Sequence, residues 1–143
     1  MSQALALPFL LAEWAMWQRV SWHLEPPLHQ EHGLTRRELL TLTQVAQGAD
    51  RAGDLVRGLH LPKYTVSRIL DGLNQEGLVS REIDTHDTRR QVVRLTPPGW
   101  RRQTAAQQTA EALIGPELEQ LGPGAAHLVT LLERFGHRSG AFP

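Results

Sequence analysis

One short stretch of the sequence concentrates side chains that can hydrogen-bond and carry positive charge. It lies near the start of a helix predicted over residues 62–76, and it contains Lys63, Tyr64, Thr65, Ser67 and Arg68. Hydroxyl groups and flexible cations are the groups with which proteins read base edges and hold phosphates, and a helix N-terminus itself favours a phosphate. The apolar residues Val66, Ile69 and Leu70 fall on the opposite side. We therefore predict that the polar side contacts duplex DNA, although any solvent-exposed helix face is also polar.

A basic segment between two predicted strands strengthens this interpretation. Residues 78–84 and 91–96 have the composition of strands, and the hairpin tip between them contains His86, Arg89 and Arg90. A basic loop of this kind can reach the minor groove, where an arginine meets a strongly negative potential. Asp84 and Asp87 are suited to hold the loop and to aim one of the arginines. The alternative is a solvated turn whose salt bridges contribute little.

The first predicted helix is more apolar than one short partner helix could cover. It spans residues 8–25, and we expect Pro26 and Pro27 to interrupt or kink it because neither has a backbone N–H. Its amphipathic stripe consists of Leu10, Trp14, Trp17, Val20, Leu24 and Leu28. Such a stripe usually belongs to a core, and we expect part of this core to be a dimer interface.

The next helices predict a helix-turn-helix. Thr35 and Glu38 form a capping-box pattern that begins a helix ending near Gly48. A short helix over residues 52–58 and a tight turn lead to the polar helix, which Gly77 ends. With the basic hairpin that follows, this order of elements is a winged helix-turn-helix, in which one helix enters the major groove.

After the hairpin the sequence returns to helix. We expect residues 97–99 to end the second strand, and an alanine-rich helix to run from residue 100 to about residue 121. Residues 122–124 break that helix, and a last helix carries the apolar residues Leu128, Leu131, Leu132 and Phe135.

The predicted fold is therefore mostly α with a small β-hairpin wing. It consists of a winged helix-turn-helix with N- and C-terminal dimerisation helices. We divide the chain into an N-terminal dimerisation helix (residues 1–33), a DNA-binding domain (34–100) and C-terminal dimerisation helices (101–143).

Composition limits the chemistry of this 143-residue chain. The absence of cysteine excludes disulfides, thiolate metal sites, a cysteine nucleophile and thiol-based redox sensing. The formal net charge is zero, but residues 51–102 contain ten Lys and Arg against six Asp and Glu, a local charge of +4. Such a basic middle can focus a field on one face, although chance scatter also gives an imbalance of this size. With no signal-like N-terminus and no long apolar run, we expect a cytoplasmic protein without a membrane span.

Several motifs resemble those of the MarR family over residues 8–138. Residues 65–73 (TVSRILDGL) and 76–81 (EGLVSR) are similar to the family's recognition helix and first wing strand. The family's wing pattern, Asp-x-Arg-Asp-x-Arg, resembles residues 84–89 (DTHDTR). His86 stands where the family usually has arginine. It can make the grip on phosphate pH-dependent, or it can simply hydrogen-bond.

The resemblance implies a homodimer in which the first and the last two helices of each chain intertwine. It also implies a pseudo-palindromic operator, repression of transcription, and a small, often aromatic effector that modulates DNA affinity. Family members hold effectors between the dimer helices and the winged module, so Trp14, Trp17 and His23 are candidate pocket residues. Alternatively, these tryptophans are plain core.

Other classes of function have less support. The sequence has no Gly-rich phosphate loop, nucleophile elbow or paired-carboxylate arrangement, so we expect neither an enzyme nor a bound cofactor. His29 and His32 are three residues apart, but no carboxylate–histidine cluster completes a metal site, and we expect none. The expected partners are double-stranded DNA, a second copy of the chain and a small effector, but no membrane. The alternative is a winged-helix domain that contacts other proteins and binds DNA weakly, without sequence preference.

Overall fold

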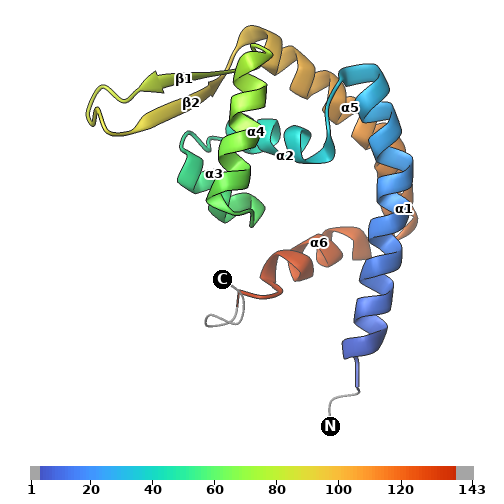
Figure 1. Cartoon of the computed structure of the whole chain (residues 1–143). Helices are drawn as coiled ribbons and strands as arrows, with labels where there is room; N and C mark the ends of the chain where they lie inside the picture. Colours follow the sequence, from blue (N-terminus) through green and yellow to red (C-terminus); the bar gives the residue numbers. More distant parts are fainter. Residues whose placement is uncertain (1–3, 138–143) are drawn as a thin grey trace.

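The computed structural model describes residues 4–137 as six helices and one antiparallel hairpin (Figure 1). The helices are α1 (Ala6–His32), α2 (Arg36–Ala46), α3 (Ala52–Leu59), α4 (Lys63–Gln75), α5 (Pro97–Gln120) and α6 (Gly124–Arg134). The strands are β1 (Val79–Ile83) and β2 (Gln91–Leu95). This confirms the predicted fold, mostly α with a hairpin wing. Residues 1–3 and 138–143 of the two predicted dimerisation segments lie outside the described residues.

Every element of the winged helix-turn-helix contributes buried side chains to its core. Leu42 of α2, Leu55 of α3 and Leu70 of α4 are almost completely buried, together with Val93 of β2. The hairpin is joined to the helices through its backbone, since the Val93 N–H donates to the carbonyl oxygen of Asp50, 2.7 Å away, in the loop between α2 and α3. One local prediction is confirmed as well: Thr35 and Glu38 form a capping box, with N···O distances of 2.9 and 3.1 Å.

The first helix is continuous through Pro26 and Pro27, so the predicted interruption is wrong. Leu24 and Leu28, on either side of the prolines, are buried in the shared core. Packing of this kind offsets the backbone hydrogen bonds that two prolines remove. The helix stops at Gly33, whose φ of 63° is the left-handed conformation of a helix C-terminus.

The fifth helix begins at Pro97, earlier than predicted. Thr96 caps it by accepting a hydrogen bond from the N–H of Gly99 at 3.1 Å, and both prolines occupy the first turn, where no N–H is needed. Gly99 allows this turn to approach the segment between α4 and β1, because a Cβ at this position would lie 1.9 Å from the carbonyl oxygen of Leu78. The diproline therefore starts a helix as well as ending a strand.

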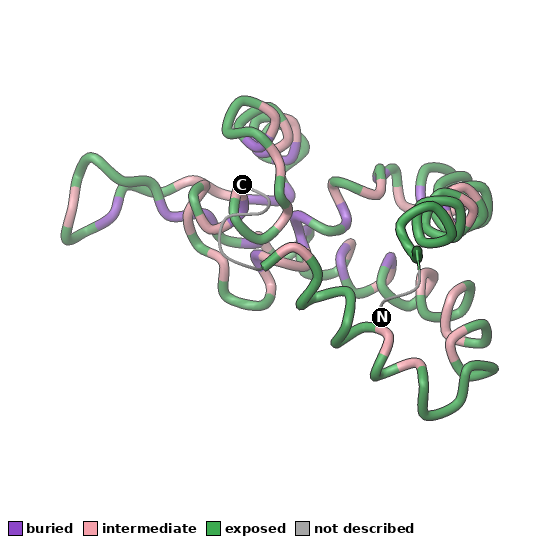
Figure 2. Tube along the Cα trace, turned by 90° about the horizontal axis from the view of Figure 1, so that it is seen from below, coloured by how far each residue is buried: buried purple, intermediate pink, exposed green. Residues whose placement is uncertain are grey.

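The terminal helices leave apolar surface uncovered in the single chain. Exposed residues dominate the N-terminal half of α1, and no described residue of α6 is buried (Figure 2). The exposed apolar side chains include Leu7, Leu10, Leu11 and Trp14 of α1 and Val129, Leu131 and Leu132 of α6. A stacked ring pair, Phe9 with Phe135 at 4.9 Å, joins α1 to the residue that follows α6. Within residues 4–137, no helix has both the length and the apolar character needed to cross a membrane.

Replacing Gly99 by alanine should destabilise the fold by at least about 1–3 kcal/mol, the usual cost of overpacking. The added Cβ would meet the Leu78 backbone, which cannot rotate away as a flexible side chain would. The matched control is Gly72→Ala in α4, where a Cβ meets nothing within 4 Å. This change should be neutral or stabilise the protein by up to about 1 kcal/mol. Urea unfolding of both variants measures the difference, and equal free energies of unfolding would contradict the close approach at Gly99.

Candidate nucleic-acid interface

The first turns of α4 present polar side chains to solvent. Lys63, Tyr64, Ser67 and Arg68 are exposed, and Thr65 is half-buried. On the other side of the helix, Val66, Leu70 and Leu73 are buried in the core, which fixes the rotation of α4 about its axis. The predicted division of α4 into a polar and an apolar face is therefore present.

Two of these side chains form a pair on the surface of α4. The guanidinium of Arg68 lies 5.7 Å from the centre of the Tyr64 ring, and its Nη1 is 3.5 Å from the Tyr64 hydroxyl. Both side chains border an open cleft of about 410 Å³ between α4 and the beginning of α2, where Arg37 adds a further cation. The surface is thus a concavity that carries two arginines, one carboxylate (Glu38) and several hydroxyl groups.

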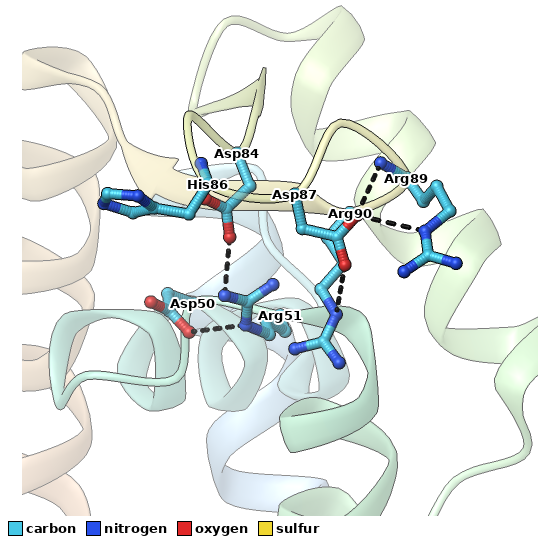
Figure 3. Close-up of polar contacts among 7 residues, drawn as sticks. All are labelled: Asp50, Arg51, Asp84, His86, Asp87, Arg89 and Arg90. Atoms are coloured by element: carbon cyan, nitrogen blue, oxygen red, sulfur yellow. Dashed lines mark hydrogen bonds and ion pairs between the residues drawn. The ribbon is translucent and has the colours of Figure 1, made fainter.

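At the tip of the wing, Asp87 holds two arginines (Figure 3). Its Oδ1 accepts from the Arg89 backbone N–H at 3.0 Å and from the Arg89 Nε at 3.2 Å, and its Oδ2 lies 3.3 Å from the Arg90 Nε. The contacts from Arg89 are the main reason why the pKa of Asp87 lies below its ordinary value. The Arg89 side chain is nevertheless 90% exposed, so Asp87 orients a guanidinium that still faces solvent.

Asp84 has a different partner, which the sequence analysis missed. Its Oδ2 accepts from Nη2 of Arg51, at the start of α3, at 2.7 Å, and its Oδ1 accepts from the backbone N–H of His86 at 2.8 Å (Figure 3). These two contacts, that from His86 first, lower the pKa of Asp84. Within the described chain, the carboxylate makes no ion pair with Arg89 or Arg90. Asp84 therefore fastens the base of the tip to α3, and Asp87 alone orients the arginines.

Arg81 was also missed, although a signal for it exists. In β1, Arg81 is two residues from the buried Val79 and therefore lies on the face of the hairpin that packs toward the helices. Its Nη1 donates to Oδ1 of Asp71 in α4 at 2.7 Å. A cation on the inner face of a strand predicts a partner on the covering helix. Arg51 gave no comparable signal, because a single basic residue before a helix has no periodicity.

The ring of His86 is exposed and points away from the Asp84–Arg51 pair (Figure 3). Its backbone N–H, rather than its imidazole, makes the hydrogen bond to Asp84. Among the described residues, no hydrogen bond of this imidazole is present. The side chain is therefore available to an external group.

The three candidate effector residues lie on α1 and are exposed. Trp14 and Trp17 are 61% and 48% exposed, and His23 is exposed as well. The guanidinium of Arg36 lies 4.1 Å from the centre of the Trp17 ring, and burial lowers the pKa of Arg36. A separate, mainly apolar cleft of about 220 Å³ lies between α2 and α5, and none of the three lines it. Its walls include Leu39, Leu40, Thr43, Ala110, Ile114 and Leu118.

Of the two histidines three residues apart, His32 bonds to a neighbouring helix. The ring of His32 contacts the hydroxyl of Thr109 in α5, with Nε2 2.7 Å from Oγ1. Residues 4–137 contain no group of three or more His, Cys, Asp or Glu side chains placed to hold a metal ion.

Comparisons with known proteins agree with this architecture. The model of the MarR family matches residues 32–90, which run from the end of α1 through the wing tip. A search of curated protein sequences found no match. Solved structures that are 20% to 24% identical in sequence share the fold over nearly the whole chain.

Three of these structures are informative. A MarR-family transcriptional regulator from Rhodococcus sp. RHA1 is 22% identical, with a TM-score of 0.76 and coverage of 99% of this chain and 98% of the other. CouR from Rhodococcus jostii RHA1, bound to p-coumaroyl-CoA, is 24% identical, with a TM-score of 0.78 and coverage of 99% and 97%. A variant of MepR from S. aureus, bound to an oligodeoxyribonucleotide, is 23% identical, with a TM-score of 0.59 and coverage of 92% and 98%.

The fold and the site define a winged helix-turn-helix protein with a helix and a basic wing open to solvent. Residues 32–90 match the model of the MarR family, and the whole chain shares its fold with a solved transcriptional regulator of that family. Members of this family are DNA-binding transcription regulators rather than enzymes.

Replacing Asp84 by asparagine should destabilise the protein at neutral pH, because it weakens the contact to Arg51 at a carboxylate that is only 10% exposed. Since folding lowers the pKa of Asp84, its contribution is complete above the ordinary carboxylate pKa and is lost as the pH falls through the folded value. The difference in free energy of unfolding between wild type and Asp84→Asn should therefore shrink below about pH 4.

Urea unfolding at a series of pH values measures this difference. The control is Glu82→Gln, which removes an exposed carboxylate from the same strand. Its effect should be small at every pH. If both variants behave alike at neutral pH, the Arg51–Asp84 contact does not fasten the wing.

Proposed function

We propose that this protein is a sequence-specific, duplex-DNA-binding transcription regulator that acts as a homodimer on a pseudo-palindromic operator. The observation that carries the proposal is the pairing of an exposed, polar α4 with a wing whose Arg89 is oriented by Asp87 yet 90% exposed. An exposed helix and an extended basic loop fit adjacent grooves of one duplex. The DNA-bound MepR variant of the same fold supports the arrangement.

Each element has a distinct role in this proposal. Lys63, Tyr64, Thr65, Ser67 and Arg68 of α4 contact base edges and phosphates in the major groove. Arg89 enters the minor groove, while Arg90 and His86 contact the backbone beside it. Asp84 and Asp87 support the wing and do not touch DNA, since a carboxylate near phosphate would repel it.

The dimer follows from the exposed apolar residues of α1 and α6. Leu10 and Trp14 of α1 and Leu131 of α6 are 53%, 61% and 47% exposed in the single chain, and large apolar side chains that are exposed together on a helix usually mark an interface. Residues 1–33 and 101–143 therefore serve dimerisation, and residues 34–100 bind DNA. Two-fold symmetry would then place two α4 helices about one helical turn apart, roughly 34–36 Å.

Repression in the cytoplasm, relieved by a small effector with an aromatic part, completes the proposal. A bound dimer covers its operator. A ligand lowers the affinity for DNA only if it binds the DNA-free conformation of the dimer more tightly than the DNA-bound conformation. Trp14, Trp17 and His23 remain the candidate effector residues, with aromatic surface still exposed for stacking. CouR, bound to p-coumaroyl-CoA, shows that this fold accommodates an aromatic ligand.

Selection from a random duplex library at near-physiological salt tests the proposal. An inverted repeat whose half-sites are one helical turn apart is the expected result, because a symmetric dimer reads the same sequence twice. The absence of any enriched sequence, with and without effector candidates, would contradict sequence-specific binding. It would favour a winged helix that contacts proteins instead.

On the selected duplex, Arg68→Ala should cost about 1–3 kcal/mol of binding free energy and relax the base preference at one position of each half-site. Arg89→Ala should weaken binding and, to the extent that Arg89 neutralises a phosphate, make its salt dependence shallower by about one unit of slope. The control is Arg134→Ala, which removes the same charge from α6. Titrations at several salt concentrations measure these effects. Equal affinities of all three variants would contradict the assigned roles of Arg68 and Arg89.

A further inference from the structure

Besides the apolar packing of Val79 and Val93 against the core, one polar side chain of the wing bonds to α4. Nη1 of Arg81 donates to Oδ1 of Asp71 at 2.7 Å, and its Nη2 donates to the backbone carbonyl oxygen of Ser67 at 3.3 Å. Asp71 and Ser67 are four residues apart, so the guanidinium spans one turn of α4 on a single side of the helix. The Arg81 side chain is 21% exposed, which limits competition from water.

This contact differs from the other attachments of the wing. Asp50 and Arg51, which hold Val93 and Asp84, belong to the loop before α3 and the start of that helix. Among the ion pairs of residues 4–137, that between Arg81 and Asp71 is the one that joins the hairpin to α4. Arg81 also donates a hydrogen bond to the backbone carbonyl oxygen of Ser67, a residue that we assign to the DNA-contacting side of α4.

The chemistry of the guanidinium suits it to fixing an angle. Its donors form a rigid, planar fork, so two hydrogen bonds to different groups restrict both the distance and the rotation of the two elements. A two-stranded hairpin has little rigidity by itself. Small changes in its tilt move the tip, where Arg89 lies, further than they move the base.

We propose that Arg81 is a positioning residue that sets the angle between the wing and α4, so that Arg89 and Arg68 engage adjacent grooves in register. The consequence for binding rests on the proposed function, whereas the geometric part concerns the DNA-free protein. Arg81 itself need not touch DNA. Its loss should lower the preference for the operator over random duplex, rather than affinity in general.

The geometric part can be measured without DNA because the chain contains no cysteine. Asn74 of α4 and Thr88 of the wing tip, both exposed, are replaced by cysteine and carry nitroxide labels. An excess of unlabelled chain suppresses the signal from two labels on different subunits of a dimer. Electron–electron double resonance should give a narrow distribution of distances between the two labels in the protein that keeps Arg81. Arg81→Met should broaden or shift it. Arg94→Met, which removes the same charge from an exposed position of β2, should leave it unchanged.

The consequence for binding is measured with the selected duplex and a random duplex of equal length. Arg81→Met should lower the ratio of the two affinities by about twofold to thirtyfold, the range expected when a residue that couples two sites is changed. Arg94→Met should lower both affinities by the same factor, since it removes a charge from the wing and nothing else. This ratio separates a positioning role from a loss of positive charge.

Asp71→Asn covers the case in which Arg81→Met does not fold. Asp71 is 58% exposed, so the substitution leaves no deeply buried group unpaired, and its effects should have the same direction as those of Arg81→Met but be smaller. Unchanged label distances and an unchanged affinity ratio in the folded variants would overturn the proposal. If the parent protein selects no duplex, the proposed function fails, and the label distances still decide whether Arg81 sets the angle.

Discussion

A two-stranded hairpin is marginally stable in water, so the wing depends on the contacts that fasten it to the helices. In addition to the packing of Val79 and Val93 in the core, three polar contacts do this: the Val93 N–H on the Asp50 carbonyl, Asp84 on Arg51, and Arg81 on α4. Two of them are ion pairs whose groups are partly shielded from solvent, where charge-assisted hydrogen bonds are stronger than at a fully exposed surface. The position of Arg89, and with it the second half of the DNA-binding surface, follows from these contacts.

The local parts of the fold were predictable from the sequence, while the parts that depend on distant contacts were not. The capping box of Thr35 and Glu38 is encoded within four residues, and the start of α2 followed directly. The apolar stripe predicted burial of Leu24 and Leu28, but no local pattern shows that their packing outweighs the hydrogen bonds lost at Pro26 and Pro27. The early start of α5 likewise depends on the close approach of Gly99 to Leu78.

The same division applies to the candidate site. The polar face of α4 and the basic tip could be predicted, because periodicity and composition decide which side of an element faces solvent. The partners of Asp84 and Asp71 could not, since Arg51 and Arg81 come from other elements and pair only in three dimensions. We expected Asp84 to lie beside the arginines of the tip, whereas its carboxylate bonds to Arg51 and to the backbone N–H of His86.

Chemical probing of the bound duplex with dimethyl sulfate tests the central claim most directly, because the reagent methylates guanine N7 in the major groove and adenine N3 in the minor groove. If α4 and the wing form one DNA-reading surface in a symmetric dimer, guanine N7 should be protected in two clusters about one helical turn apart. Adenine N3 should then be protected beside each cluster, where Arg89 enters the minor groove. Protection of guanine N7 without adenine N3, or no protection in either groove, would contradict the account.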